Sequence, residues 1–425
     1  MLDVMSLNDK VLSNLAANSE KVQAYLKDAC DIVMGPLDDN IGTTPYEVVY
    51  QEDRVKLKLY RSPKPEKSKI KTPLLVVYAL INRETMLDLQ PGRSVVQKFL
   101  NDGVDVYMID WGYPTRKDKF LTIDDHVNIY IDSAVDFIRK ASGKAKVNLM
   151  GICMGGTFCT IYSAFYPEKV KNLVLTVTPT SFDNEDGLLH VWMKDIDVDK
   201  VVDAFGNMPG DIMNFGFLLL NPARLMLDKY KGFMSNLNDK VFVENFVRME
   251  KWIFDSPDVP GETFRQFIKD LYQNNLLIQS KLKVGDRIVD LKKVTMPVLN
   301  IFAKFDHLVP PAASNQITKK LGSKDVRDVC LETGHIGIYV SSKYQNEFVP
   351  MITGWLKDRD KEEVPSAVKK KAESSQKKQA AKNVQDKQDI MDDDIGSQGV
   401  ASNEDYIEPA VQIQLSAGPE TGIKS

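Results

Sequence analysis

Six short apolar runs, each followed by a segment in which apolar residues recur at helical spacing, constrain the fold of this 425-residue chain most strongly. The segment before them, 46–62, alternates apolar and polar residues as an antiparallel hairpin does. Continuous apolar strands that alternate with helices are typical of a parallel sheet covered on both faces, so this order predicts an α/β architecture. The runs are PLLVVYAL (73–80), VDVYMIDW (104–111), KVNLMG (146–151), VKNLVLTVTP (170–179), MPVLNIFA (296–303) and DVRDVCLE (325–332).

The long gap between the fourth and fifth runs contains helical patterns and no strand pattern that we accept. We therefore predict a mostly helical cap at 183–290, inserted into a core made of 41–182 and 291–357. Caps of this kind control access to a site and shape it. Its many Met, Phe and Leu residues either pack between helices or expose apolar surface when the cap opens.

The two ends of the chain differ from the core. Residues 1–40 have apolar residues at helical spacing, which predicts amphipathic helices that pack on the main domain or contact a partner or an apolar surface. Residues 358–425 are charged and poor in large apolar side chains, which predicts a disordered or marginally helical tail. This tail is basic in its first half and acidic in its second, and it is either a solvated tail or a partner contact.

Cys153 stands in the stretch NLMGICMGGTFCT, between a predicted strand and a predicted helix. Glycines at 151 and 155 permit a sharp turn, which resembles the nucleophile turn of α/β-hydrolases with cysteine in place of the usual serine. The N-terminus of the next helix favours a thiolate. The backbone N–H of Met154 would point at a developing oxyanion. Cys153 is therefore the candidate nucleophile, with a buried structural cysteine as the alternative.

An acid and a base follow in the order that this fold requires. Asp306 comes just after the run at 296–303, and His335 lies on a glycine-flanked loop after the last run. In α/β-hydrolases the order is nucleophile, acid, histidine, so His335 is the predicted base and His307 comes too early. The other two histidines, His126 and His190, have no matching sequence context.

Composition excludes several classes of function. The formal net charge of −4 gives no overall excess of positive charge, so nucleic acid is not the expected partner. No signal peptide and no run of about 18 apolar residues is present, so we expect a cytoplasmic protein without a membrane span. The cysteines have no metal-site or disulfide spacing, which argues against a zinc site and a disulfide framework and indicates a reducing compartment. We expect no metal and no bound cofactor. We interpret the remaining cysteines as buried structural residues: Cys30, Cys159 and Cys330.

A cysteine at the nucleophile turn exchanges readily with thioesters, which suits acyl transfer from an acyl-coenzyme A. It does not exclude hydrolysis, because dienelactone-type hydrolases also use cysteine there. From the residues alone, the chemistry is acyl transfer or hydrolysis through a covalent thioester.

Several separated motifs resemble the polyhydroxyalkanoate synthase family over residues from about 40 to 357. The short N-terminal region resembles the class III and class IV catalytic subunits. The motifs are GICMGG (151–156), YALINRETMLDLQPGRS (78–94), DWGYP (110–114), FDHLVP (305–310), GHIGIYVS (334–341) and KWIFDSPDVPGETFRQFIKDLYQNN (251–275).

The resemblance implies polymerisation of (R)-3-hydroxyacyl-coenzyme A, typically the 3-hydroxybutyryl thioester, with release of coenzyme A. Cys153 would hold the acyl group, His335 would activate it, and Asp306 would help to activate the substrate hydroxyl. Ile81 and Asn82 would lie nearest to the second half of the oxyanion hole. His307 would line the site.

The resemblance also implies a second, non-catalytic subunit similar to PhaE or PhaR, association with polyester granules, and a homodimer. The terminal segments are candidate contacts for the partner. The alternatives are a cysteine hydrolase, either an intracellular polyester depolymerase or a dienelactone-type enzyme, and a non-enzymatic scaffold. A dienelactone-type enzyme would not need a cap of about 100 residues.

Overall fold

The structure is a computed structural model that describes residues 21, 23–25, 27–183 and 187–360. The predictions for residues 1–20 and for the tail beyond 360 lie outside the described residues. At the predicted start of that tail, residue 358, the chain is still helical, because α13 (Ser342–Arg359) continues to Arg359. The carboxylate of Asp360 then accepts hydrogen bonds from the backbone N–H groups of Lys71 and Thr72.

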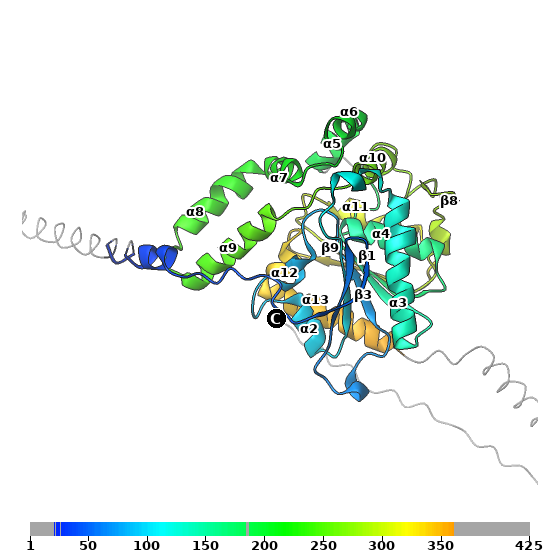
Figure 1. The fold of residues 1–425 in the computed structure, drawn as a ribbon, viewed down its shortest axis with the longest axis horizontal. Coiled ribbons are helices and arrows are strands. Elements are labelled where there is room, and N and C mark those ends of the chain that lie inside the picture. Colours follow the sequence, from blue (N-terminus) through cyan, green and yellow to red (C-terminus); the bar gives the residue numbers. More distant parts are fainter. Residues whose placement is uncertain (1–20, 22, 26, 184–186, 361–425) are drawn as a thin grey trace, which may run out of the picture. The chain divides into compact units, whose positions relative to one another are not determined.

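The core is an eight-stranded sheet with the order β1-β2-β4-β3-β5-β6-β9-β10 (Figure 1). β2 pairs antiparallel with both β1 and β4, and all other neighbours are parallel. Each predicted run forms a strand, so the α/β class with a mostly parallel sheet is confirmed. The strands are β1 (Glu47–Glu52), β2 (Val55–Tyr60), β3 (Leu74–Val77), β4 (Val106–Asp110), β5 (Val147–Ile152), β6 (Val170–Thr176), β9 (Val298–Ala303) and β10 (Val326–Leu331).

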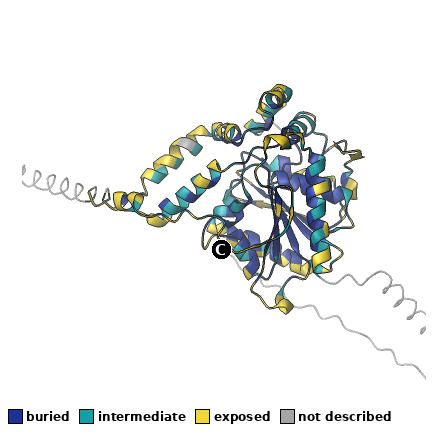
Figure 2. Ribbon diagram, in the orientation of Figure 1, coloured by how far each residue is buried: buried dark blue, intermediate teal, exposed yellow. Residues whose placement is uncertain are grey.

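Helices cover both faces of the sheet, which explains why its central strands are mostly apolar, with Asp110 and Asn148 as buried polar exceptions. Every residue of β3, β4 and β5 is buried (Figure 2). In Figure 1, α3 (Asp132–Ser142) and α4 (Met154–Phe165) lie on one face, and α2 (Val95–Asn101) and α13 lie on the other. Burial on two faces leaves no polar side to alternate with, so the strands read as continuous apolar runs.

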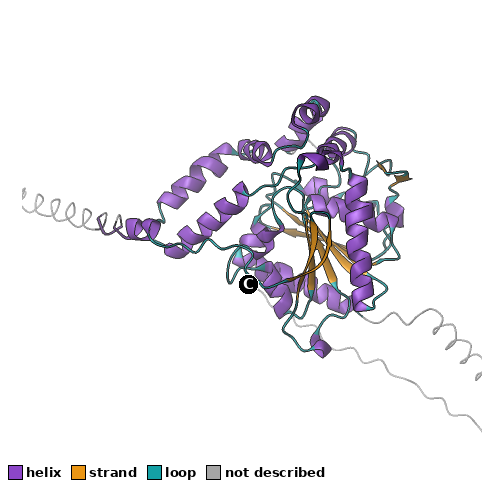
Figure 3. Cartoon of the chain, viewed as in Figure 1, coloured by secondary structure: helices purple, strands orange, loops and turns teal. Residues whose placement is uncertain are grey.

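The segment between β6 and β9 is mostly helical (Figure 3). It also contains a two-stranded ribbon, β7 (Lys283–Val284) and β8 (Arg287–Ile288), that the sequence patterns did not predict. Two residues per strand are too few to show a period of two. The helical elements are α5 (Leu188–Asp195), α6 (Val198–Phe205), α7 (Gly210–Leu219), η5 (Ala223–Asp228), α8 (Lys229–Met234), α9 (Lys240–Phe254), α10 (Gly261–Gln266), η6 (Phe267–Gln273) and η7 (Leu291–Lys293).

Helices α8 and α9 form an antiparallel pair within this segment. Phe233 stacks on Phe246 with ring centroids 4.1 Å apart. The N-terminal segment contacts this pair: the Tyr25 hydroxyl donates to the carbonyl oxygen of Met234, and Arg248 binds the Asp38 carboxylate at 2.7 Å. The described part of the amphipathic N-terminal segment therefore packs on the predicted cap.

The four cysteines differ in exposure. Cys159, on α4, is fully buried, as expected for a structural residue. The same interpretation of Cys30 and Cys330 is wrong, because both are exposed. Cys330 lies on β10, which is the last strand of the sheet and has only one buried residue.

Candidate active site

Cys153 occupies a strained turn between β5 and α4. Its backbone has a φ of 52° and a ψ of −125°, a combination that side-chain-bearing residues rarely adopt. Hydrogen bonds on both sides hold the turn: Cys153 N–H donates to the Thr176 carbonyl at 2.9 Å, and Gly156 N–H donates to the Cys153 carbonyl at 2.8 Å. This strand–turn–helix geometry is the one that presents a nucleophile above the end of the sheet.

The glycines around Cys153 are required by the close approach of backbone to backbone. A Cβ atom on Gly155 would lie 2.2 Å from the carbonyl oxygen of Val77. A Cβ atom on Gly151 would lie 2.4 Å from the Cα atom of Gly156. No larger residue fits at 151 or 155, so the motif quoted for the turn is fixed by packing of α4 against the sheet.

Asp306 and His335 lie together at the ends of β9 and β10. The distance from His335 Nδ1 to Asp306 Oδ2 is 2.6 Å. The other carboxylate oxygen accepts the backbone N–H groups of Leu308 at 2.9 Å and Val309 at 2.8 Å, and the Asp306 side chain is fully buried. With Nδ1 bound to the carboxylate, Nε2 is the nitrogen left for the Cys153 thiol.

The charges around His335 favour its protonated form. Burial opposes protonation, but the charges of Asp306 and Cys153 and hydrogen bonds to both outweigh it and raise the pKa of His335 to about 10. The structure thus brings together the three predicted residues Cys153, Asp306 and His335. This arrangement can store the thiol proton on the imidazole while Asp306 stabilises the resulting charge.

Three tyrosines surround the nucleophile, and the sequence patterns did not single them out. Burial raises the pKa of Tyr78, Tyr272 and Tyr339, and the nearby charge of Cys153 raises each further. The Tyr339 hydroxyl donates to Thr176 Oγ1 at 2.9 Å, which links the His335 loop to the strand that holds the Cys153 turn. All three lie in the motifs quoted above, but from sequence alone an aromatic residue in an apolar run is interpreted as part of the hydrophobic core.

Met154 is the first residue of α4, so its backbone N–H has no partner within the helix and is available for an oxyanion. On the other side of the turn, the Tyr78 carbonyl oxygen lies against Gly155 and accepts the Trp111 indole N–H at 2.9 Å. The Asn82 side chain is directed to the predicted cap, where it donates to the Ser256 hydroxyl. The assignment of Ile81 and Asn82 to the oxyanion hole stays a prediction, as does a role for half-buried His307.

The loop after β3 is bound to both the core and α9. Within the core, Lys58 Nζ lies 2.6 Å from a carboxylate oxygen of Glu84 and 2.8 Å from one of Asp110. From α9, the Trp252 indole N–H donates to the Arg83 carbonyl at 2.9 Å. Removing one member of a buried ion-pair group is strongly destabilising, so this loop is held firmly.

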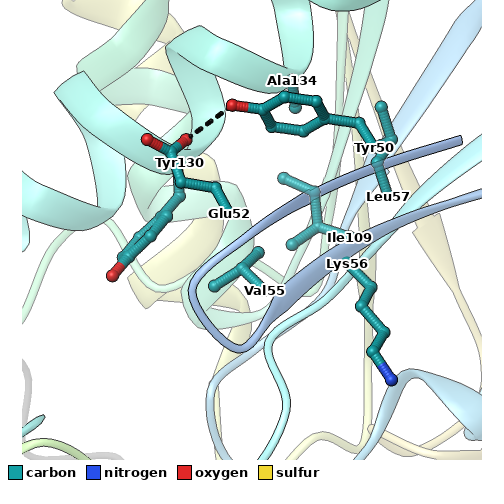
Figure 4. A pocket seen from close by; sticks show the side chains of 8 residues that line it. All are labelled: Tyr50, Glu52, Val55, Lys56, Leu57, Ile109, Tyr130 and Ala134. Atoms are coloured by element: carbon teal, nitrogen blue, oxygen red, sulfur yellow. Dashed lines mark hydrogen bonds between the residues drawn. The ribbon is translucent and has the colours of Figure 1, made fainter. Parts of the chain in front are cut away.

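A small surface pocket lies at the β1–β2 hairpin (Figure 4). The Tyr50 hydroxyl donates to the Glu52 carboxylate at 3.1 Å beside it. None of Cys153, Asp306 and His335 lines this pocket, so we assign it no part in the chemistry. Across the described ranges no three His, Cys, Asp or Glu residues cluster as a metal site would require. In those ranges no helix combines the length and hydropathy of a membrane span.

Comparison with known proteins identifies two matching family models. The alpha/beta hydrolase fold model matches residues 72–341, which confirms the predicted fold. A model described as the N-terminus of poly-beta-hydroxybutyrate polymerase (PhaC) matches residues 5–99 and so begins well before residue 40.

Two curated relatives are each named poly(3-hydroxyalkanoate) polymerase subunit PhaC. That of Allochromatium vinosum is 50% identical over 318 residues, which cover 75% of this chain and 90% of the relative. That of Synechocystis sp. is 44% identical over 364 residues, 84% of this chain and 92% of the relative. A solved structure of a monoacylglycerol lipase from Paleococcus ferrophilus has a TM-score of 0.45 and 16% identity, with 72% of this chain and 99% of the lipase covered.

Proposed function

Because the chain belongs to the poly(3-hydroxyalkanoate) polymerase family, whose members are acyltransferases, we propose that it polymerises (R)-3-hydroxyacyl-coenzyme A through a thioester on Cys153. The observation that supports this most directly is the proximity of Cys153, His335 and Asp306 at a strained strand–helix turn. The 3-hydroxybutyryl thioester is the substrate that we would test first.

In the first step, His335 Nε2 already holds the proton of the Cys153 thiol, in keeping with the raised pKa of His335, and Sγ attacks the thioester carbonyl carbon. The Met154 N–H stabilises the oxyanion of the tetrahedral intermediate. The bond from that carbon to the coenzyme A sulfur then breaks, and His335 returns the proton to the leaving sulfur. The products are acylated Cys153 and free coenzyme A.

In the second step, the 3-hydroxyl of an incoming hydroxyacyl-coenzyme A attacks the acyl group on Cys153. Its proton passes to His335, whose charge Asp306 balances, and then to Sγ as the carbon–sulfur bond breaks. An ester bond forms, and the lengthened chain, now on coenzyme A, acylates Cys153 again. Each cycle adds one hydroxyacyl unit and releases one coenzyme A.

Hydrolysis is the alternative, since water could replace the 3-hydroxyl. Among the groups around Cys153, buried Tyr78 and half-buried Tyr272 restrict water access, which favours transfer over hydrolysis. We further propose a cytoplasmic, granule-associated homodimer that acts with a second subunit similar to PhaE or PhaR and has no bound cofactor. The exposed apolar residues of α7 to α9 and the N-terminal segment are candidate contacts.

The test measures coenzyme A release from (R)-3-hydroxybutyryl-coenzyme A together with product size, for wild type and Cys153→Ala. We expect high-mass polyester from wild type and neither polyester nor coenzyme A release from the variant. Free 3-hydroxybutyrate as the only product would show a hydrolase instead. If wild type releases no coenzyme A, the assay is repeated with a PhaE-type or PhaR-type subunit added, and inactivity there as well would overturn the proposal.

A further inference from the structure

His190, on α5, is a buried histidine whose two ring nitrogens have no hydrogen-bond partner in the described structure. The residue is only 3% exposed. A buried donor or acceptor without a partner destabilises the fold, and native structures rarely keep one without a function or an absent ligand. His190 lacks a partner at both Nδ1 and Nε2, so a partner for either nitrogen must come from outside the described residues.

Aromatic rings pack against His190, and one of them is near the reaction centre. Its ring centroid lies 5.1 Å from that of Tyr272 and 6.0 Å from that of Phe182. Burial raises the pKa of Tyr272, and the charges of Cys153 and Asp306 raise it further, so its hydroxyl is near the reaction centre. Tyr272 therefore contacts His190 and lies within electrostatic range of Cys153.

The loop that carries Asp306 also passes close to His190. A Cβ atom on Gly187 would lie 2.9 Å from His190 Nδ1 and 3.0 Å from Pro310 Cγ, so these groups converge on one point. Pro310 directly follows Val309, whose backbone N–H binds Asp306. His190 thus lies next to the loop that carries Asp306, on its α5 side.

The chemistry of the surroundings limits what can bind. Burial lowers the pKa of His190 to about 4, so the ring is neutral at pH 7 and offers one N–H donor and one acceptor. The neighbouring rings are apolar and carry no cation, which disfavours the diphosphate of coenzyme A. A single water would need two to four polar partners, and the aromatic rings provide few. A ligand here must be apolar and must offer an acceptor to the imidazole N–H. A polyester chain does both, because it is apolar and each repeat carries a carbonyl oxygen.

We propose that His190, Phe182 and Tyr272 form a subsite for the growing polyester chain, in which the His190 imidazole N–H donates to an ester carbonyl oxygen of that chain. This inference rests on the proposed polymerase function. The subsite retains the chain between additions, so its loss shortens the product more than it slows the first acylation of Cys153.

The test compares His190→Phe, which keeps an aromatic ring but removes both nitrogens, with His190→Gln, which restores a neutral donor and acceptor. The readouts are polymer molar mass, the rate of the first coenzyme A release, and the melting temperature. For His190→Phe we expect a molar mass lower by about fivefold, the effect of one neutral hydrogen bond on retention. The melting temperature should stay the same or rise, because two unsatisfied buried atoms are removed. His190→Gln should recover most of the chain length.

His126→Phe is the matched control, since His126 is also buried and has one unpartnered nitrogen, at Nε2, but packs against Trp111 and Phe158 in the core. Wild-type chain length in His190→Phe would overturn the inference while leaving the polymerase function intact. A lower melting temperature with equal losses in first acylation and chain length would also overturn it, by showing a structural role. If wild type yields only free hydroxyacid, the polymerase proposal and this inference both fail.

Discussion

Two buried histidines, one from the core and one from α5, have opposite electrostatic environments. His335, from the core, binds Asp306 at 2.6 Å and contacts Cys153, and its pKa is raised to about 10. His190, from α5, has no partner among the described residues, and burial lowers its pKa to about 4. The core side has its hydrogen bonds in place before substrate arrives, whereas the α5 side keeps two unsatisfied atoms. We infer that the core side is organised for chemistry and the α5 side for contact with the chain.

On the core side, the largest effect is expected from the substitution Cys153→Ala. Without the nucleophile no thioester can form, and loss of a nucleophile reduces turnover by about 10⁴-fold or more. The measurement is coenzyme A release under saturating substrate. Cys330→Ala is the matched control, because Cys330 is exposed on β10 and should retain wild-type turnover. If Cys153→Ala retained a tenth of wild-type turnover, the covalent mechanism would be excluded.

Asp306→Asn makes the environment of His335 more like that of His190. The amide can still accept the backbone N–H groups of Leu308 and Val309, so the loop keeps its shape, but the balancing charge is lost. We expect turnover to fall by about 10²- to 10⁴-fold, as it does when a triad acid is neutralised. The pKa of His335 should fall as well, because Asp306 raises it. An imidazole titration by NMR checks this, and an unshifted His335 would contradict the pairing.

The two histidines should give stability opposite pH dependences. The folded-state pKa of His335 is raised to about 10 from the ordinary value near 6.5, so its stabilisation is complete below pH 6.5 and is lost as pH rises toward 10. The folded-state pKa of His190 is lowered to about 4, so the unfolded chain binds more protons between pH 4 and 6.5, and stability falls as pH falls through that window.

The His190→Phe variant separates the acid part of this pH dependence from the alkaline part. The measurement is the melting temperature at a series of pH values from 4 to 10. The variant should gain stability over wild type below pH 6.5, on the order of 2 kcal/mol near pH 4, and should match the shape of wild type above pH 7. His126 also has a pKa lowered to about 4 by burial, and it is present in both proteins. Both proteins should therefore still lose some stability as the pH falls from 6.5 to 4. If wild type and variant lost the same stability between pH 6.5 and pH 4, His190 would not be buried in solution.

The difference between the two sides also explains what could be predicted from the sequence. Cys153 and Asp306 each follow a mostly apolar strand, and His335 follows the edge strand β10. The carboxyl ends of parallel strands lie at one edge of the sheet, so chain order alone places the three residues together. His190 follows no strand. Its position depends on how α5 packs against η6 and Pro310, and no local period encodes that packing. Tyr272 was missed for a related reason, since an aromatic residue in a helix reads as core.

The smallest predicted effect concerns the link between α9 and the loop after β3. Trp252→Phe removes the indole N–H that binds the Arg83 carbonyl at 2.9 Å and keeps most of the aromatic packing. We expect the free energy of unfolding to fall by about 1–2 kcal/mol and turnover to fall a few-fold, because the loop that carries the proposed oxyanion residues Ile81 and Asn82 loses one anchor. Phe254→Ala, on the same helix but 60% exposed, is the control and should change unfolding by less than about 0.5 kcal/mol. If Trp252→Phe lowers stability without slowing the first coenzyme A release, the α9 contact supports the fold alone, and the catalytic loop is positioned by the Lys58, Glu84 and Asp110 ion pairs.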